Sequence, residues 1–196
     1  AHRSVVWLSG VRRTGKTSLS QSLDGVDEYL DCELPRVRRK LDDPEGFLAS
    51  VSGKRIILDE IHRLRAPAEL LKIAADHYPK LQVLATGSST LGASRKFRDT
   101  LTGRKAELWL TPMILADLKD FHQEALQHRL LHGGLPPFFL AQTPPDRDFQ
   151  EWMDAYWAKD IQELFRLERR YSFQKFAELI MARSGGIFEA NKFTTE

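Results

Sequence analysis

The sequence predicts an α/β protein, with a five-stranded parallel sheet followed by a smaller helical region. Three observations support this prediction. Short apolar runs alternate with helical patterns as far as residue 111. After Pro112 the strand patterns stop and only helical patterns follow. The length of 196 residues accommodates one good-sized domain with a small appendage.

The expected strands are short, apolar and bounded by turn residues or charges. They are residues 4–10, 27–31, 55–60, 81–87 and 105–110. The expected helices between them include two that open with a proline, a residue favoured in the first helical turn. These helices are residues 17–25, 44–51 and 67–78, and one more follows a loop within 88–101. The remaining segment, PRVRRK at 35–40, is expected to be a basic connector.

The second part of the chain contains three helical patterns, at residues 117–131, 148–167 and 172–184. The middle pattern contains Trp152 and its aromatic neighbours. We expect these rings to lie in the core or to face a partner helix, and not to serve as a stacking platform.

Composition limits the classes of function. The chain has 29 basic and 27 acidic residues, a formal net charge of +2, without the basic excess typical of nucleic-acid binders. A basic cluster at residues 36–40 is therefore expected to be a solvated face, with nucleic-acid contact as the alternative. One cysteine excludes an intrachain disulfide and fits a reducing cytoplasm. No apolar run reaches the roughly 18 residues of a membrane span, so we expect no membrane association.

The most informative motif is GVRRTGKT at residues 10–17, which fits G-x-x-x-x-G-K-[ST] between an expected strand and an expected helix. Gly15 permits a tight turn that points successive N–H groups at phosphate oxygens. Lys16 would reach the β- and γ-phosphates, and the Thr17 hydroxyl would ligate Mg²⁺. The motif predicts a loop that binds ATP or ADP through Gly10, Val11, Arg12, Arg13, Thr14, Gly15, Lys16, Thr17 and Ser18.

An acidic pair ends the strand RIILDE. Hydrolysis of a bound nucleotide needs an acid to organise the metal and a group to orient water. Asp59 is expected to hold Mg²⁺ and Glu60 to polarise the attacking water. In open parallel sheets, ligands bind at the carboxyl ends of strands, where both acids fall. The alternative is a strand that merely ends in solvated acids.

Several motifs together resemble a known family. The apolar run ending in Asp59–Glu60 resembles the Walker B element of AAA+ ATPases, and LQVLATGSS resembles their sensor-1 strand, with Thr86 or Ser88 as the sensor. The order GVRRTGKT, ILDEIHRL, ATGSSTL, LTGRK, HGGLPPFF and AYWAKDIQELFRLE is similar to a prokaryotic family of AAA-type ATPases whose C-terminal half is a domain of unknown function. The resemblance covers nearly the whole chain.

This resemblance implies a P-loop NTPase fold of the AAA+ type with strand order 5-1-4-3-2. It divides the chain into an ATPase core at 1–111, a helical lid at 112–184 and the start of a winged-helix-like segment at 185–196. Family members are longer, so we expect this chain to be the N-terminal part of a larger protein. The remainder would contact a protein or DNA.

Arg104 lies where the arginine finger of AAA+ proteins is found, which would imply a homo-oligomer in which Arg104 reaches a neighbouring site. The alternative is a surface arginine beside a turn. The HGGLPP stretch resembles the GxP element of related lids, or is a simple turn between helices. The expected catalytic residues are Lys16, Asp59, Glu60, Thr86, Ser88 and Arg104.

The function expected from these features is ATP hydrolysis to ADP and phosphate, which drives a conformational switch of the lid. One alternative is a P-loop kinase of a small molecule, which would need an acceptor-binding domain and an arginine-rich lid. The other is a nucleotide-binding regulatory module with little turnover that interacts with DNA or protein. A GTPase is disfavoured because no guanine-reading motif occurs at a suitable place.

Overall fold

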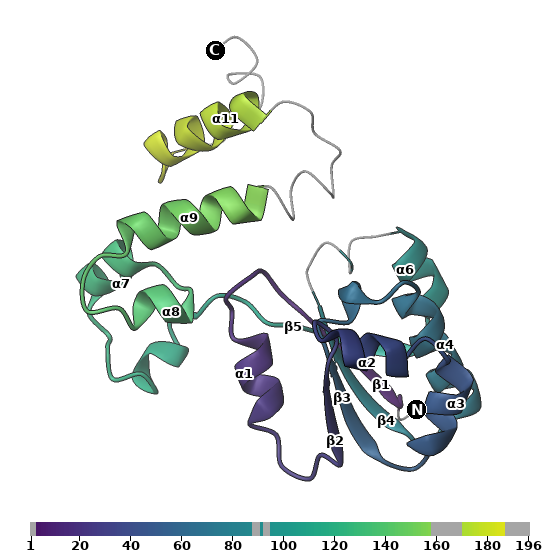
Figure 1. The fold of residues 1–196 in the computed structure, drawn as a ribbon. Coiled ribbons are helices and arrows are strands. Elements are labelled where there is room, and N and C mark those ends of the chain that lie inside the picture. Colours follow the sequence, from purple (N-terminus) through teal and green to yellow (C-terminus); the bar gives the residue numbers. More distant parts are fainter. Residues whose placement is uncertain (1–2, 88–90, 92–94, 158–169, 187–196) are drawn as a thin grey trace.

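A five-stranded, fully parallel sheet forms the centre of the molecule (Figure 1). The computed structural model describes residues 3–87, 91, 95–157 and 170–186. The strand order is β2-β3-β4-β1-β5, which confirms the predicted order 5-1-4-3-2. The strands are β1 Val5–Ser9, β2 Glu28–Asp31, β3 Arg55–Asp59, β4 Gln82–Thr86 and β5 Lys105–Trp109.

Helices cover both faces of the sheet. Helix α1 packs against β3 and β4, while α4 packs against β1 and also contacts α3 and α6. In Figure 1, α1 lies on one side of the sheet and α3, α4 and α6 lie on the other, as right-handed crossovers require. Their bounds, with two further elements, are α1 Lys16–Gln21, α2 Pro35–Lys40, α3 Pro44–Ser50, η1 Ile61–Arg63, α4 Pro67–His77 and α6 Arg95–Leu101.

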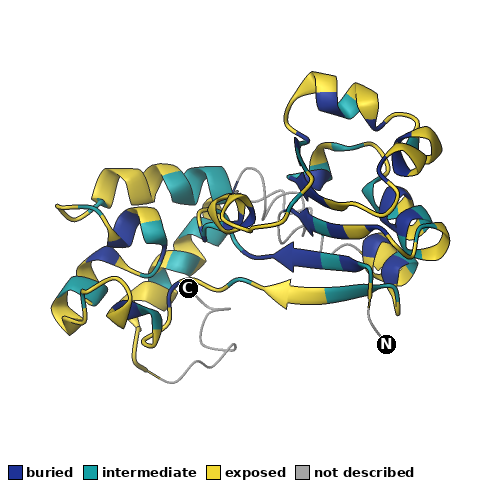
Figure 2. Ribbon diagram, turned by 90° about the horizontal axis from the view of Figure 1, so that it is seen from below, coloured by how far each residue is buried: buried dark blue, intermediate teal, exposed yellow. Residues whose placement is uncertain are grey.

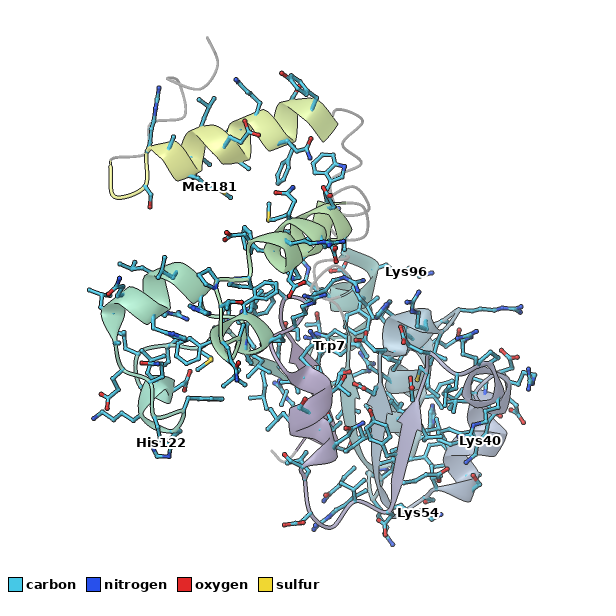
Figure 3. All side chains as sticks on the ribbon, turned by 60° about the vertical axis from the view of Figure 1, so that its left-hand side comes forward. Trp7, Lys40, Lys54, Lys96, His122 and Met181 are labelled. Carbon is cyan, nitrogen blue, oxygen red and sulfur yellow. The ribbon has the colours of Figure 1, made fainter. Side chains whose placement is uncertain are left out.

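The main core fills the space between the sheet and the layer of α3, α4 and α6. Trp7 of β1 is fully buried there and contacts Phe97 of α6, with ring centroids 4.9 Å apart (Figure 3). Gly87 follows β4, and a Cβ atom at this position would lie 2.5 Å from the Trp7 ring. The bulk of Trp7 therefore explains why the chain leaves β4 through a glycine.

The edge strand β5 differs from the other strands in its exposure. Figure 2 shows β5 mostly exposed, and Leu108 and Trp109 each keep 55% of their surface. The alternating pattern of its sequence is consistent with a strand buried on one face at most. It nevertheless pairs with β1 along its whole length, with Val5 opposite Lys105 and Ser9 opposite Trp109, and so forms one edge of the sheet.

Two local predictions were wrong. The segment at 35–40 is helix α2 and not a connector, because Pro35 occupies its first turn and the apolar side of the turn buries Val37. The pattern at 117–131 is not one helix. A 3₁₀ turn at Asp117–Lys119 (η2) is followed by a left-handed residue, His122, and helix α7 begins only at Leu126.

The helical part that follows β5 contains α7 Leu126–His132, α8 Pro136–Phe139, α9 Asp146–Tyr156 and α11 Arg170–Ala182. The stacked rings of His128 and His132 hold α7 against α8, since one nitrogen of each lies within hydrogen-bonding distance of a carbonyl oxygen, of Phe139 and Phe138 respectively. Within the described segments, no helix combines the length and the apolar character that crossing a membrane requires. The winged-helix-like start expected at 185–196 lies almost wholly outside the described residues.

Candidate functional site

The loop between β1 and α1 has the backbone geometry of a phosphate cradle. A Cβ atom on Gly10 would lie 2.4 Å from the carbonyl oxygen of Leu110, so only glycine fits there. Gly15 has φ 95°, in the left-handed region that glycine adopts at no steric cost, and no atom lies within 4 Å of the position a Cβ would take. The loop therefore turns tightly and leaves open space above Gly15, where a phosphate can approach the backbone.

Lys16 is the first residue of α1, and its side chain folds back over this loop. It is 7% exposed, and its Nζ donates hydrogen bonds of 2.9 Å to the carbonyl oxygens of Gly10 and Val11. A largely buried ammonium group held by carbonyl dipoles is a strong site of attraction for an anion. The ammonium group thus lies beside the open space of the loop.

Asp59, at the end of β3, is buried and accepts hydrogen bonds from three hydroxyl groups. Thr17 Oγ1 donates to Oδ2 at 2.9 Å, and Tyr29 donates to the same oxygen at 2.6 Å. Thr86 Oγ1 donates to Oδ1. These contacts fix the orientation of the carboxylate and place it next to the hydroxyl of the phosphate loop.

Tyr29 is a member of this group that the sequence analysis missed. It lies on β2, the neighbour of β3, and Gln21 Nε2 donates to its hydroxyl at 3.3 Å. Burial, and then the hydrogen bond to Asp59, raise the pKa of Tyr29, so the phenol stays protonated and remains a donor. Only the adjacency of β2 and β3 could have indicated this contact, because no local motif joins Tyr29 to Asp59.

Glu60 follows Asp59 and adopts a left-handed backbone conformation with φ 53°, which is uncommon for residues other than glycine. Its N–H donates to Thr86 Oγ1 at 3.0 Å, and its Oε2 lies 3.0 Å from His62 Nδ1. The close contact with His62 lowers the pKa of Glu60, with smaller contributions from the charges of Lys16 and Arg12 that oppose the effect of burial. Glu60 is therefore an ionised acceptor at neutral pH.

A cavity of about 430 Å³ lies between the phosphate loop with Glu60 and the helical part of the chain. One wall comes from the phosphate loop and Glu60, and the other from α8 and α9. The lining residues are Arg12, Arg13, Gly15, Lys16, Thr17, Ser18, Glu60, Pro136, Pro137, Trp152 and Ala155. The guanidinium of Arg13 also lies 5.4 Å from the ring centroid of Phe138, which joins the loop directly to α8.

Two features of the cavity lining, Trp152 and the HGGLPP stretch, lie where the sequence alone did not predict them. Trp152 was expected in the core or at a partner face, yet it lines the cavity and stacks on Phe149 and Tyr156. Pro136 of the HGGLPP stretch also lines it, while Arg129 binds the carbonyl oxygens of Gly133 and Met113 at the preceding turn. The stretch is thus both a turn between helices and a wall of the cavity.

The oxygen ligands of the site fit Mg²⁺ bound together with a nucleotide. In the segments that the structure describes, no three His, Cys, Asp or Glu side chains are grouped so that they could hold a metal. Thr17 Oγ1 and Asp59 Oδ2 are hard oxygen ligands 2.9 Å apart at the rim of the phosphate loop. Mg²⁺ commonly uses one or two protein oxygens and completes its shell with phosphate and water.

The remaining predicted residues have different positions. Thr86 is fully buried and lies behind the acidic pair, bound to Asp59 and Glu60. Arg104 precedes β5, at the edge of the sheet opposite the phosphate loop, and forms an ion pair with Asp76 at 2.7 Å. The structure therefore does not bring Arg104 to the cavity of its own chain. Ser88 lies outside the described residues.

A family model described as an AAA domain matches residues 2–119. The uncharacterized proteins Mb2031c of Mycobacterium bovis and Rv2008c of Mycobacterium tuberculosis are each 30% identical over 159 residues, which are 79% of this chain and 35% of each relative. The chain thus spans about a third of the length of the curated relatives it matches.

Two solved structures are similar at lower identity. The Aeropyrum pernix ORC1 protein, in complex with DNA, is 19% identical, with a TM-score of 0.42 over 93% of this chain and 61% of that chain. A RuvB variant of Thermotoga maritima is 18% identical, with a TM-score of 0.45 over 98% of this chain and 73% of that chain.

Proposed function

The chain belongs to the AAA+ P-loop ATPase family, and from this premise we propose that it binds ATP with Mg²⁺ and hydrolyses it to ADP and phosphate. The observation that supports hydrolysis, beyond binding, is the placement of Glu60. Its ionised carboxylate lines the same cavity as Lys16 and the open turn at Gly15.

Each residue has a distinct role in this proposal. The loop N–H groups and Lys16 bind the phosphates, and Arg12, Arg13 and Ser18 line the same cavity. Thr17 and Asp59 would hold Mg²⁺, which neutralises charge on the phosphates when bound. Glu60 accepts a proton from, or orients, the attacking water. Thr86 keeps both acids in place and so acts as a positioning residue in this chain.

Three features favour the ATPase over the two alternatives. A kinase of a small molecule needs an acceptor site near the γ-phosphate, whereas the wall opposite the loop consists of Pro136, Pro137, Trp152 and Ala155. A module that only binds nucleotide needs no carboxylate in the cavity. The close contact of its carboxylate with His62 and the hydrogen bond from its N–H to Thr86 accompany the left-handed backbone of Glu60, a conformation that is often found at functional sites.

We further propose that nucleotide moves the helical part as a lid. The cavity lies between the phosphate loop and helices α8 and α9, so a bound nucleotide contacts both walls. Arg13 contacts Phe138 from within the loop, and a phosphate would compete for its guanidinium. Binding and release would therefore change the position of α8 relative to the loop. Further domains, which the longer relatives have room for, would respond to that change and contact protein or DNA.

The test of this proposal is phosphate release from Mg-ATP by the wild-type chain, with Mg-GTP as the comparison. We expect steady release from ATP that stops when EDTA removes the metal. Stoichiometric binding of ATP without release of phosphate, at all concentrations of the chain, would instead support a regulatory module that only binds nucleotide. Transfer of the γ-phosphate to a small acceptor without free phosphate would support a kinase.

We propose that Arg104 acts on the site of a neighbouring copy in a homo-oligomer. We expect Arg104→Ala to lower turnover by at least about tenfold while leaving ATP binding unchanged, because a finger stabilises the transition state and not the bound nucleotide. The matched control is Asp76→Ala, which removes the same ion pair but keeps the guanidinium. An equal loss in both variants would contradict this role, because the loss would then come from the ion pair.

A further inference from the structure

Two adjoining cavities, separate from the nucleotide cavity, run along the start of α4. The larger, of about 680 Å³, lies between α2, the turn into α3, η1 and the first turn of α4. The smaller, of about 340 Å³, lies between α4 and α6. Both are lined by Arg65, Ala66 and Glu69, so together they form one groove, here named the basic groove.

Positive charge dominates the described lining of the basic groove. Two of its side chains are carboxylates, Asp42 and Glu69, whereas six are cationic: Arg38, Arg39, Arg63, Arg65, Lys72 and Lys96. The formal excess is four positive charges, twice the net charge of +2 of the whole chain. The near balance of the full sequence therefore conceals a local concentration of cations.

Two of these cationic side chains are held by neighbouring groups, and two others have no side-chain partner in the described residues. Arg38 donates to the carbonyl oxygens of Cys32 and Glu33, and Arg63 pairs with the Glu33 carboxylate at 2.9 Å. The side chains of Arg39 and Arg65, both exposed, form no hydrogen bond or ion pair with any residue in the described part of the chain. Two guanidinium groups thus remain to bind a ligand.

The arrangement of the charges favours an extended anion. The cations come from α2, η1, the turn between η1 and α4, α4 and α6, and they follow both cavities, so a single phosphate or carboxylate would contact only some of them. Arginine is well suited to phosphodiester oxygens, which its planar fork can bind in pairs. Several such contacts along one line are typical of a nucleic-acid backbone.

The described lining of the groove offers no exposed ring on which an unpaired base could stack. Phe97 is the one aromatic residue in its described lining, and it is 2% exposed. Proteins that bind single strands generally use exposed aromatic rings for this purpose. Contacts limited to the phosphate backbone of the nucleic acid instead suit a duplex, which has a higher charge density than a single strand.

We propose that the basic groove binds the phosphate backbone of double-stranded nucleic acid without selecting its sequence. The site lies at the same edge of the sheet as the nucleotide cavity, since η1 follows Glu60 directly and carries Arg63. It shares no lining residue with that cavity among the described residues. Its test is therefore independent of whether the chain hydrolyses ATP.

The experiment is a fluorescence-polarisation titration of a short labelled DNA duplex of mixed sequence. The variant combines Arg39→Glu with Arg65→Glu, which reverses two exposed charges of the groove. The control combines Lys54→Glu with Arg55→Glu, the same charge change at the far end of the core domain (Figure 3 shows Lys54 distant from Lys96). Circular dichroism and thermal unfolding verify that all three proteins are folded.

We expect the groove variant to bind the duplex at least about tenfold more weakly than wild type, with a shallower dependence of affinity on salt. The control should stay within about twofold of wild type. Equal losses in both variants, or no binding by the folded wild type, would overturn the proposal. So would tighter binding of a single strand or of polyglutamate than of the duplex, since the ligand would then be of another kind.

Discussion

Replacing Lys16 with alanine is expected to weaken the binding of Mg-ATP by roughly 100-fold or more. The ammonium group lies beside the open turn at Gly15 and is largely removed from water, so its attraction to a phosphate is little screened. Alanine removes both the charge and the hydrogen bonds. Calorimetric titration of the variant with Mg-ATP measures the loss.

Two comparisons separate this effect from damage to the loop, because Lys16 also binds the carbonyl oxygens of Gly10 and Val11. Lys16→Met keeps the aliphatic stem and removes only the ammonium group, and it should lose as much affinity as alanine. Lys54→Ala removes an exposed lysine elsewhere and should bind normally. Wild-type affinity in a folded Lys16→Met variant would show that the loop does not bind phosphate through this lysine.

Glu60→Gln is expected to lower the rate of ATP hydrolysis by roughly 100-fold to 1,000-fold while affinity for Mg-ATP changes little. Glutamine has nearly the same shape and can keep the backbone contact with Thr86, but its amide cannot accept a proton from water. Single-turnover phosphate release, combined with a binding titration, separates the two effects.

The matched control for this variant is Glu33→Gln, which neutralises an exposed acid at the same edge of the sheet. It should leave turnover unchanged. If Glu60→Gln hydrolyses ATP as fast as wild type, Glu60 does not activate the water. The chain would then be better described as a nucleotide-binding switch whose activity depends on another residue or another subunit.

Local patterns predicted the central features because their chemistry is local. Residues 10–17 need a glycine-rich turn between a strand and a helix, and the structure has that turn, with φ 95° at Gly15. The apolar strand ending in Asp59–Glu60 also forms as predicted. The strand order came from the family resemblance, since no periodicity in the sequence states which strands are neighbours.

The features that were missed depend on contacts between distant parts of the chain. Tyr29 reaches Asp59 only because β2 pairs with β3, and Trp152 lines the nucleotide cavity only because α9 lies over the phosphate loop. His62 stands two residues after Glu60, and its contact with the carboxylate occurs together with a left-handed backbone at Glu60 that no local pattern predicted. The basic cluster at residues 36–40, of which Arg38 and Arg39 line the basic groove, was judged from the total charge, which says nothing about how charges gather in space.

The most direct test of the central claim is a calorimetric titration of the wild-type chain with Mg-ATP, repeated in EDTA. We predict saturable binding of one nucleotide per chain that weakens when the metal is removed, because Thr17 and Asp59 would hold Mg²⁺ against the phosphates. A folded wild-type chain that binds neither Mg-ATP nor Mg-ADP would contradict the assignment of the nucleotide site to residues 10–17 and 59–60.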